Sequence, residues 1–350
     1  MKVIIPDYLK NIIARFIDQG FDIYLVGGSL RDIILGCEVQ DFDLATNALP
    51  DTVSGLFSKT VNVGKNYGTI IVVSQGHNIE VTTLRKESGY TDARHPETVI
   101  FCNDIFEDLS RRDFTMNAIA YDFKTGRIID PFNGQEAIRE HVITCVGNPK
   151  ERLKEDTLRI FRAARFSAQL GFSIERTTLA ALQELSPHVQ LPAAERIKTE
   201  LIKLCKGTNF KQGLNYLYEW GLFSRLIAAD LSSFPERITN IPETFDLCQR
   251  IACFFSTLPR QEIDETLEKL RFTRKEIKTI KGLINNNFDY NLSALTVKSL
   301  DITGQEIKDL GFDGPIIGKI QQFLLAEIKS KKIENQKDIL LAIIRKSYLE

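Results

Sequence analysis

Two short segments near the N-terminus combine residue types that bind phosphate and divalent cations. The first reads LVGGSLRD, in which an apolar strand ends in Gly27 and Gly28 and a helix begins near Ser29. Glycines without Cβ let a phosphate approach the backbone, and the first turn of a helix offers unpaired N–H groups. Arg31 lies one turn further on, where its guanidinium can reach the same anion. Alone, a Gly-Gly turn is more often an ordinary strand-to-helix connection.

The second segment, QDFDLAT, places carboxylates at Asp41 and Asp43. On a strand, residues two apart share a face, so both carboxylates would face a cleft while the residues beside them face the core. Carboxylate oxygens favour Mg²⁺ over zinc or copper. We therefore predict that this pair holds Mg²⁺, where two ions about 4 Å apart can activate a hydroxyl and neutralise a leaving pyrophosphate. Glu80, in a predicted strand over residues 79–84, has the chemistry of a third ligand, but an exposed strand residue explains it equally well.

Composition restricts the class of protein that carries these segments. The chain has 350 residues, of which 43% are hydrophobic and 26% charged, as expected for a globular protein with more than one domain. No run is long and apolar enough to span a bilayer, and charges interrupt the N-terminal apolar stretch, so we expect a soluble, cytoplasmic protein. The six cysteines are scattered, as in reduced proteins. The four histidines, including His95, have no zinc-binding spacing, and no Ser/His/Asp grouping supports hydrolysis.

Charge and predicted secondary structure both change near residue 149. Residues 1–149 contain 14 Lys and Arg and 20 Asp and Glu, a net charge of −6. The remaining residues contain 31 Lys and Arg and 26 Asp and Glu, a net charge of +5. An acidic head that holds cations and a basic body that contacts phosphates would give this division, as would ordinary solvated surfaces.

Hydrophobic periodicity predicts two kinds of structure along the chain. The expected strands are residues 22–26, 41–45, 69–73 and 79–84, and the expected helices among them are residues 29–35 and 51–57. Beyond residue 149 the 3.6-residue period predicts helices over residues 155–169, 193–204 and 213–222 and onward to the C-terminus. The fold class is therefore α+β, a mixed head followed by a helical body.

The stretch LVGGSLRDIILGCEVQDFDLATNALP resembles the signature of class II tRNA nucleotidyltransferases, the CCA-adding enzymes, and of the related bacterial poly(A) polymerases. VTTLRKESGYTDARHPETVIF resembles the family's flexible loop, RRDFTMNAIAYD its ribose-recognition segment, and AAERIKTEL the helix that supports its neck. DPFNGQEAIREHVITCVGNPKERLKEDTLRIFRAARF resembles its link into the neck. The resemblance is specific through about residue 204. It implies a polymerase-β-type head with a mixed sheet over residues 1–146, a helical neck for base selection over 147–210, and a helical body and tail for tRNA binding over 211–350.

The segment RRDFTMNA offers groups that fit a nucleoside triphosphate. Paired arginines would neutralise the phosphates, and Asp113 and Asn117 supply acceptor and donor groups for ribose hydroxyls. By the resemblance, Arg112 contacts the nucleotide together with Asp113 and Asn117. Arg111 is better explained by a surface ion pair with Asp108.

Polar residues recur every third position along the predicted neck helix, at Asp156, Arg159, Arg162 and Arg165. Such a ribbon is usually the solvated face of a helix. Cytosine and adenine, however, each present an amino donor beside a ring-nitrogen acceptor, which Asp156 and Arg159 can pair, whereas uracil and guanine would meet two mismatches. In the resembling family an EDxxR segment selects the base in this way, matched here by Glu155, Asp156 and Arg159. Arg162 and Arg165 match further nucleotide-contacting arginines.

The C-terminal region carries cations that suit an RNA backbone. The residues Arg271, Arg274, Lys275, Lys278 and Lys281 would load one side of a helix, and a glycine-rich turn over residues 311–319 precedes another helix. A solvated helix face explains them equally well. By the resemblance, the body and tail hold the acceptor and TΨC arms of tRNA.

The expected function is addition of C, C and A to the 3′ end of tRNA from CTP and ATP, with protein side chains choosing the base. An enzyme that adds only the terminal A shares every motif, while the undeleted loop over residues 85–101 disfavours a CC-only enzyme. A poly(A) polymerase is disfavoured because no strongly basic C-terminal extension follows. A non-catalytic RNA-binding protein would be expected to lose Asp41 or Asp43. The oligomeric state stays open.

Overall fold

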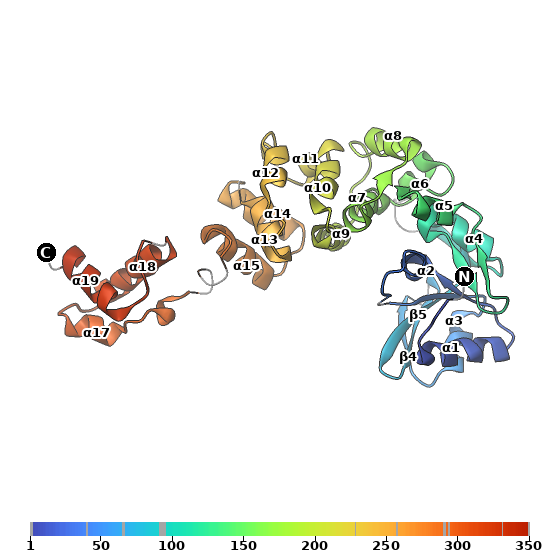
Figure 1. Cartoon of the computed structure of the whole chain (residues 1–350), viewed down its shortest axis with the longest axis horizontal. Coiled ribbons are helices and arrows are strands. Elements are labelled where there is room, and N and C mark those ends of the chain that lie inside the picture. Colours follow the sequence, from blue (N-terminus) through green and yellow to red (C-terminus); the bar gives the residue numbers. More distant parts are fainter. Residues whose placement is uncertain are drawn as a thin grey trace. The chain divides into compact units, whose positions relative to one another are not determined.

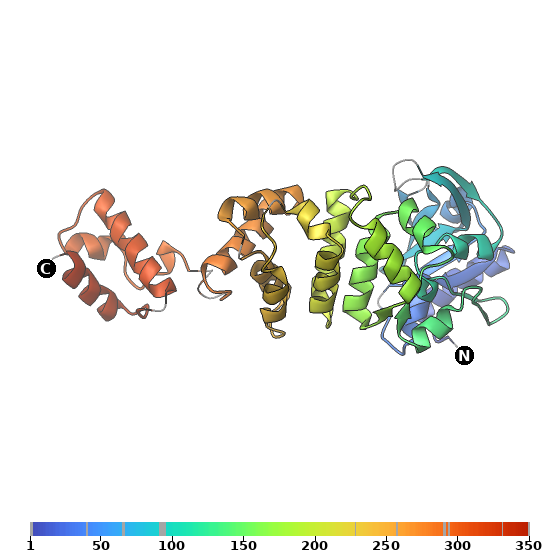
Figure 2. The same cartoon turned by 90° about the horizontal axis from the view of Figure 1, so that it is seen from above.

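The computed structural model describes the chain except for residues 1–2, 40, 65–66, 91–95, 228, 257, 290–291, 293–294, 331 and 349–350. The chain forms two compact units, Met1–Arg225 and Leu226–Glu350, coloured from blue to red along the sequence in Figures 1 and 2. The boundaries proposed after residues 146 and 210 stay predictions.

A seven-stranded sheet forms the centre of the head, in the order β3-β4-β5-β2-β1-β8-β9. Its strands are β1 Ile23–Val26, β2 Asp43–Thr46, β3 Thr60–Gly64, β4 Thr69–Ser74, β5 His77–Thr83, β8 Ala120–Asp122 and β9 Arg127–Ile129. Only β2 and β5 pair in parallel, and the other neighbours in this sheet are antiparallel. The sheet is therefore mixed, as the resemblance implied.

Short helices lie before, between and after the strands of this sheet in the sequence (Figure 1). They are α1 Asp7–Asp18, α2 Gly27–Ile34, α3 Pro50–Leu56, α4 Ile105–Ser110, the 3₁₀ turn η2 Thr115–Asn117 and α5 Gly134–Arg139. The loop predicted over residues 85–101 contains an antiparallel pair, β6 Arg85–Tyr90 and β7 Pro96–Phe101. His95 lies outside the described residues.

Two element boundaries in the head differ from the prediction. Strand β2 begins at Asp43, so Asp41 precedes the strand, although Phe42 and Leu44 are buried as expected. Helix α2 begins at Gly27, two residues before the predicted start, and Gly27 has a φ of +68°. This left-handed value is readily adopted only by glycine, so the Gly-Gly pair opens the helix instead of preceding it.

The predicted neck contains helices α6 Pro149–Glu155, α7 Leu158–Leu170, α8 Arg176–Leu185 and α9 Ala194–Lys206, and α10 Phe210–Glu219 and α11 Leu222–Leu226 follow it. Strand β10 Val142–Ile143 precedes α7 in the sequence, and it pairs in parallel with β11 Ser173–Ile174, which follows α7. The helix predicted over residues 155–169 is present as α7, but it begins at Leu158, because Asp156 is extended, with φ −139° and ψ 104°. Its Oδ1 accepts a hydrogen bond of 3.0 Å from the Leu158 backbone N–H, the local bonding by which aspartate interrupts helices.

Glycines bring α9 and α10 close to α7. A Cβ on Gly207, directly after α9, would lie 2.4 Å from the Ala168 carbonyl oxygen of α7. A Cβ on Gly213, in α10, would lie 2.8 Å from the Ala164 carbonyl oxygen. Backbone therefore packs on backbone at these crossings, which fixes the position of the helix that carries Arg159, Arg162 and Arg165.

The described residues of the second unit form helices and connecting turns, with no strand among them. Its elements are α12 Phe234–Asn240, α13 Leu247–Phe255, α14 Arg260–Lys269, α15 Arg274–Asn285, η3 Val297–Ser299, α17 Gly304–Asp309, α18 Pro315–Lys329 and α19 Lys337–Tyr348. The prediction that Arg271 lies on the cationic helix is wrong, because α15 begins after a capping box formed by Thr273 and Glu276. The turn before α18 is confirmed, with positive φ at Gly311 and Gly314. In the described part of the chain, no helix is long and apolar enough to cross a membrane.

Candidate active site

One cavity of about 380 Å³ in the first unit collects most of the residues that the sequence singled out. The predicted residues that line it are Gly28, Arg31, Asp43, Arg112, Asp113, Asn117, Asp156, Arg159, Arg162 and Arg165. They come from α2, β2, the turn around η2, and the neck, and the first and last of them, Gly28 and Arg165, are 137 positions apart in the sequence. Asp41 is not among the lining residues, which also include Gly27, Arg111, Phe166 and Lys203.

The carboxylates at the start of β2 lie in different environments, because Asp43 is partly buried and Asp41 is exposed. Burial, together with the negative charges of Glu80 and Asp41, raises the pKa of Asp43 to about 6. A cation beside these carboxylates would relieve that repulsion, so the donor set fits a hard divalent ion. Glu80 pairs with Asp43 in the β2–β5 register. Among the described residues, however, no three His, Cys, Asp or Glu side chains converge on a metal position.

Gly27 leaves space between these carboxylates and an arginine. A Cβ at this position would lie 3.2 Å from Arg112 Nη1 and 3.3 Å from Asp43 Oδ2. At the next residue, a Cβ on Gly28 would lie 3.4 Å from Arg31 Nη2. The two glycines thus keep open a position where a phosphate can meet two guanidinium groups and a carboxylate-bound cation.

A hydrogen-bonded chain joins α2, η2 and α7. Arg31 Nη1 donates to Asn117 Oδ1 at 2.8 Å, and Asn117 Nδ2 donates to Asp113 Oδ1 at 3.0 Å. Arg162 Nε donates to Asp113 Oδ2 at 2.7 Å. Burial opposes ionisation of Asp113, but the charge of Arg162 together with the hydrogen bonds from Asn117, Phe114 and Arg162 outweighs it and holds the Asp113 pKa well below its usual range. Asp113 is therefore ionised, and hydrogen bonds tie the predicted ribose-contacting pair to Arg31 of α2 and Arg162 of α7.

The ion pair predicted between Arg111 and Asp108 is present, but it is not on the surface. Asp108 is 1% exposed, and its Oδ1 lies 2.7 Å from Arg111 Nη2. Its Oδ2 lies 2.9 Å from Arg112 Nη2. Burial opposes ionisation, but the charges of Arg111 and Arg112 lower the Asp108 pKa to about 2. Both arginines of the RR pair thus depend on one buried carboxylate.

The predicted base-selecting residues, Asp156 and Arg159, are each held by different protein groups. Arg196 of α9 donates to both oxygens of Asp156, at 3.1 Å and 2.7 Å. Arg159 lies 2.7 Å from a Glu155 oxygen and donates to the Arg111 carbonyl oxygen at 2.9 Å. A carboxylate has about four lone-pair sites and a guanidinium has five N–H groups, so each still has capacity for a base.

Similarity to known proteins extends over the whole chain. The family model described as "Poly A polymerase head domain" matches residues 23–144, and "Probable RNA and SrmB- binding site of polymerase A" matches residues 171–229. The CCA-adding enzyme of Staphylococcus epidermidis is 38% identical over 82% of this chain and 74% of its own length. That of Ligilactobacillus salivarius is 34% identical over 98% of this chain and 97% of its own length. The chain belongs to the CCA-adding enzyme family.

Other family members match to different extents. The CCA-adding enzyme of Geobacillus sp. is 48% identical, and the matched region spans about half of that relative, 52% of its length. A solved structure, the Bacillus stearothermophilus CCA-adding enzyme in complex with CTP, is 28% identical with a TM-score of 0.72 over 97% of this chain and 96% of that chain. The α+β fold and the membership of the tRNA nucleotidyltransferases predicted from the sequence are therefore confirmed.

Sequence reasoning missed contacts that depend on convergence in space. The ring of Phe166, whose spacing suggested only an apolar core position, lies 3.6 Å from the Arg165 guanidinium carbon. The guanidinium carbons of Arg31 and Arg162 both lie 5.2 Å from the same ring centroid. Lys203 on α9 is exposed and adds a further cation to the cavity lining. No periodicity on one segment could show that three arginines from two helices meet on one aromatic ring.

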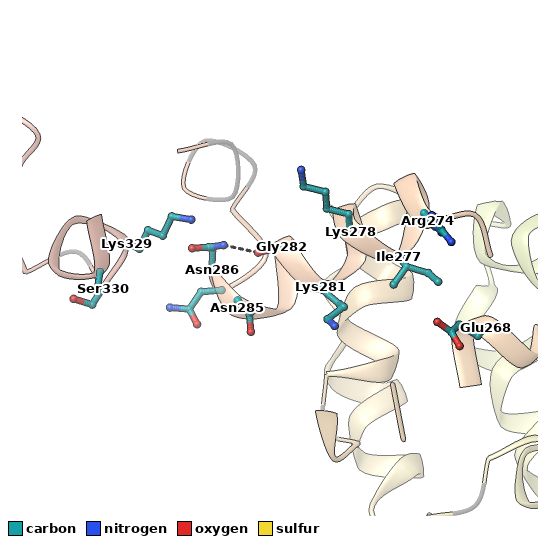
Figure 3. Close-up of a pocket in the computed structure, with 12 residues that line it drawn as sticks. Glu268, Arg274, Ile277, Lys278, Lys281, Gly282, Asn285, Asn286, Lys329 and Ser330 are labelled. Carbon is teal, nitrogen blue, oxygen red and sulfur yellow. Dashed lines mark hydrogen bonds between the residues drawn. The ribbon is translucent and has the colours of Figure 1, made fainter. Parts of the chain in front are cut away.

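A larger cavity, of about 840 Å³, lies in the second unit. Arg274, Lys278 and Lys281 of α15 line it together with Asn286 and Lys329 (Figure 3). Its lining contains neither the Gly-Gly turn nor the aspartate pair, so the smaller cavity is the candidate active site. Of the α15 cations, Lys281 is paired with Asp264 at 2.7 Å, whereas Arg274, Lys275 and Lys278 are exposed.

Proposed function

We propose that this chain adds C, C and A to the 3′ end of tRNA from CTP and ATP, without a nucleic-acid template and with release of pyrophosphate. The observation that carries the proposal is the smaller cavity, where the Gly-Gly turn, Asp43, the RRD segment and the neck arginines meet in a member of the CCA-adding family. Because CTP, ATP and tRNA are cytoplasmic solutes, we place the activity in the cytoplasm.

Asp41 and Asp43 would hold the divalent cations that the nucleotidyltransferase family uses, and we propose that these ions are Mg²⁺. Bound there, the metal would supply charge neutralisation of the triphosphate and activation of the RNA 3′-hydroxyl. The chain's own part is to bind and orient. Arg112, at the rim of the Gly27 turn, would hold phosphate oxygens in the orientation that Asp108 imposes on its guanidinium.

The sugar and base would be selected by groups that are already fixed. Asp113 is held by the Phe114 backbone N–H, by Asn117, and by both Nε and Nη2 of Arg162. A ribose hydroxyl would displace one of these donors to bind a carboxylate oxygen that is already fixed in place. Asp156 would accept from the exocyclic amino group of cytosine or adenine, and Arg159 would donate to the adjacent ring nitrogen. Because Asp156 and Arg159 are each hydrogen-bonded to other protein groups, they present a fixed pattern of one acceptor and one donor. Uracil and guanine would not match this pattern.

Incorporation of labelled nucleotide separates this function from its alternatives. Purified protein is incubated with Mg²⁺, labelled CTP or ATP, and tRNA that ends at the discriminator base, at CC or at CCA. We expect CMP to enter the first substrate and AMP to enter the second. AMP incorporation into the CC-ended tRNA alone would indicate an A-adding enzyme, and long AMP tails on unrelated RNA a poly(A) polymerase. Binding without incorporation would indicate a non-catalytic RNA-binding protein.

The metal assignment has its own test. Asp41→Ala and Asp43→Ala should each abolish transfer while tRNA binding stays near the wild-type level, because neither carboxylate contributes to phosphate affinity. Glu80→Ala is the matched control, since Glu80 neighbours Asp43 but completes no three-carboxylate cluster, and it should retain transfer. Near-wild-type turnover of either aspartate variant would contradict the assignment, and loss of transfer in Glu80→Ala would show a third ligand.

We further propose that the exposed α15 cations bind the acceptor and TΨC arms of tRNA. Neutralising Arg274, Lys275 and Lys278 together should flatten the plot of log Kd for tRNA against log salt by about one unit per cation. The matched control removes Lys10, Lys124 and Lys150, three surface cations of the first unit that are already paired with carboxylates. Equal slopes in the two triple variants would assign the α15 cations to an ordinary solvated surface.

A further inference from the structure

Asp108 holds both arginines of the RR pair, although it contacts neither metal nor nucleotide positions itself. It belongs to α4 and is buried, and it is not among the residues that line the cavity. Arg111 donates to its Oδ1 through Nε at 3.0 Å and Nη2 at 2.7 Å. Arg112 donates to its Oδ2 through Nη2 at 2.9 Å. Each carboxylate oxygen therefore fixes a different guanidinium.

The two arginines lead to different ends of the cavity, Arg112 through its guanidinium and Arg111 through its main-chain carbonyl. Arg112 Nη1 donates to the Asn117 carbonyl oxygen at 3.3 Å and lies beside the Gly27 turn, the phosphate end. Arg111 lies toward the base end, because its carbonyl oxygen accepts from Arg159 Nη2 at 2.9 Å. Arg159 is 7% exposed, and this contact is one of three hydrogen bonds that hold its guanidinium, the others being to Glu155 and to the Arg152 carbonyl oxygen. One carboxylate is thus connected to the phosphate-contacting and the base-contacting arginines.

We propose that Asp108 is a positioning residue that sets the placement of Arg112 relative to Arg159, and thereby nucleotide affinity and base choice together. The inference rests on the proposed function, because it assumes that the cavity binds CTP and ATP. A carboxylate is required here, since an amide offers one acceptor oxygen and directs N–H groups at the second guanidinium. Losing one charge-assisted hydrogen bond to a phosphate-binding arginine lowers affinity by about tenfold or more.

The test compares Asp108→Asn with Ile12→Ala, a core substitution in α1 that lowers stability without touching the cavity. Both proteins are measured well below their melting temperatures. For Asp108→Asn we expect the KM for CTP and for ATP to rise about tenfold or more, with kcat changed less than about threefold. We also expect more UMP incorporation relative to CMP, because Arg159 is less firmly held. Ile12→Ala should keep the wild-type KM and base selectivity.

Asp108→Glu and Arg111→Met make the result independent of whether Asp108→Asn folds. Asp108→Glu retains the charge and should recover part of the CTP affinity. Arg111→Met leaves the Asp108–Arg112 pair intact but removes the side chain by which Asp108 anchors the Arg111 main chain, whose carbonyl oxygen accepts from Arg159. It should therefore reduce base selectivity more than it raises KM. A lowered melting temperature with unchanged KM and selectivity in the Asp108 variants would overturn the proposal and leave Asp108 a structural ion pair. Wild-type protein that neither binds CTP nor transfers it would instead refute the proposed function on which the inference rests.

Discussion

Replacement of Gly27 by alanine should damage nucleotide binding out of proportion to its effect on stability. Gly27 has a φ of +68°, and an L-residue in this region loses about 1–2 kcal/mol of stability. The added methyl would also lie 3.2 Å from Arg112 Nη1 and 3.3 Å from Asp43 Oδ2, closer than ordinary contact. It would therefore displace the guanidinium and fill the space left for a phosphate. Losing a charge-assisted phosphate contact costs about 1.5–3 kcal/mol, so KM for CTP and for ATP should rise about 10- to 100-fold.

Gly20→Ala is the matched control, because it isolates backbone strain from crowding. Gly20 follows α1 with a φ of +82°, and no atom lies within 4 Å of its hypothetical Cβ. Urea melts should show similar losses of unfolding free energy for the two variants, about 1–2 kcal/mol. Steady-state assays with CC-ended tRNA and varied ATP should show the KM change in Gly27→Ala alone. Wild-type KM values in Gly27→Ala, or equal defects in both variants, would refute the assignment of this turn to phosphate.

Three further predictions concern packing, pH and base choice. Gly207→Ala should lower the unfolding free energy by about 1–3 kcal/mol, because its methyl would lie 2.4 Å from the Ala168 carbonyl oxygen. Gly55→Ala, at a helical site where no other atom lies within 4 Å of the added Cβ, should raise the unfolding free energy by about 0.5–1 kcal/mol. Equal changes in the urea melts of the two variants would contradict close packing of Gly207 on α7. The Asp108 pKa is lowered from 3.8 to about 2, so its ionisation contributes about 2 kcal/mol that is present above pH 4 and lost as pH falls toward 2. The difference in unfolding free energy between wild type and Asp108→Asn should shrink over that range, and a pH-independent difference would argue against an ionised Asp108. Arg196→Met removes both hydrogen bonds to Asp156, so it should increase GMP and UMP incorporation relative to CMP; unchanged ratios would show that Asp156 is positioned by other groups.

The sequence predicted the types of element and the cavity residues better than it predicted their junctions. The mixed head and helical remainder follow from short alternating runs that give way to a 3.6-residue period. Asp156, however, continues that period while its side chain bonds to the Leu158 backbone N–H, so periodicity started the helix at residue 155, whereas α7 starts at Leu158. Arg271 was likewise included in a helix by spacing alone, although the capping box at Thr273 sets a later start.

Burial was the second quantity that local pattern could not supply. The spacing of Arg111 and Asp108 indicated that these two residues form an ion pair. It did not indicate that Asp108 is 1% exposed or that it also pairs with Arg112. The convergence of Arg31 and Arg165 on Phe166 depends on how α2 packs against α7, which no single segment encodes. The charged ribbon of the neck was weighed against a solvated face, and its Arg159 and Arg165 are both 7% exposed.

Competition among the four nucleotides tests most directly whether side chains of this chain select the base. Wild type and the double variant Asp156→Arg with Arg159→Asp are given CC-ended or discriminator-ended tRNA, Mg²⁺ and all four triphosphates, and the added 3′ nucleotides are sequenced. Melting temperature and Mg²⁺ affinity are measured on the same samples, so that misfolding or loss of metal is recognised. The wild type should add only C, C and A in order, and the reversed variant should lose preference for CTP and ATP while still binding Mg²⁺. An unchanged preference for C and A in a folded, metal-binding double variant would contradict base selection by Asp156 and Arg159.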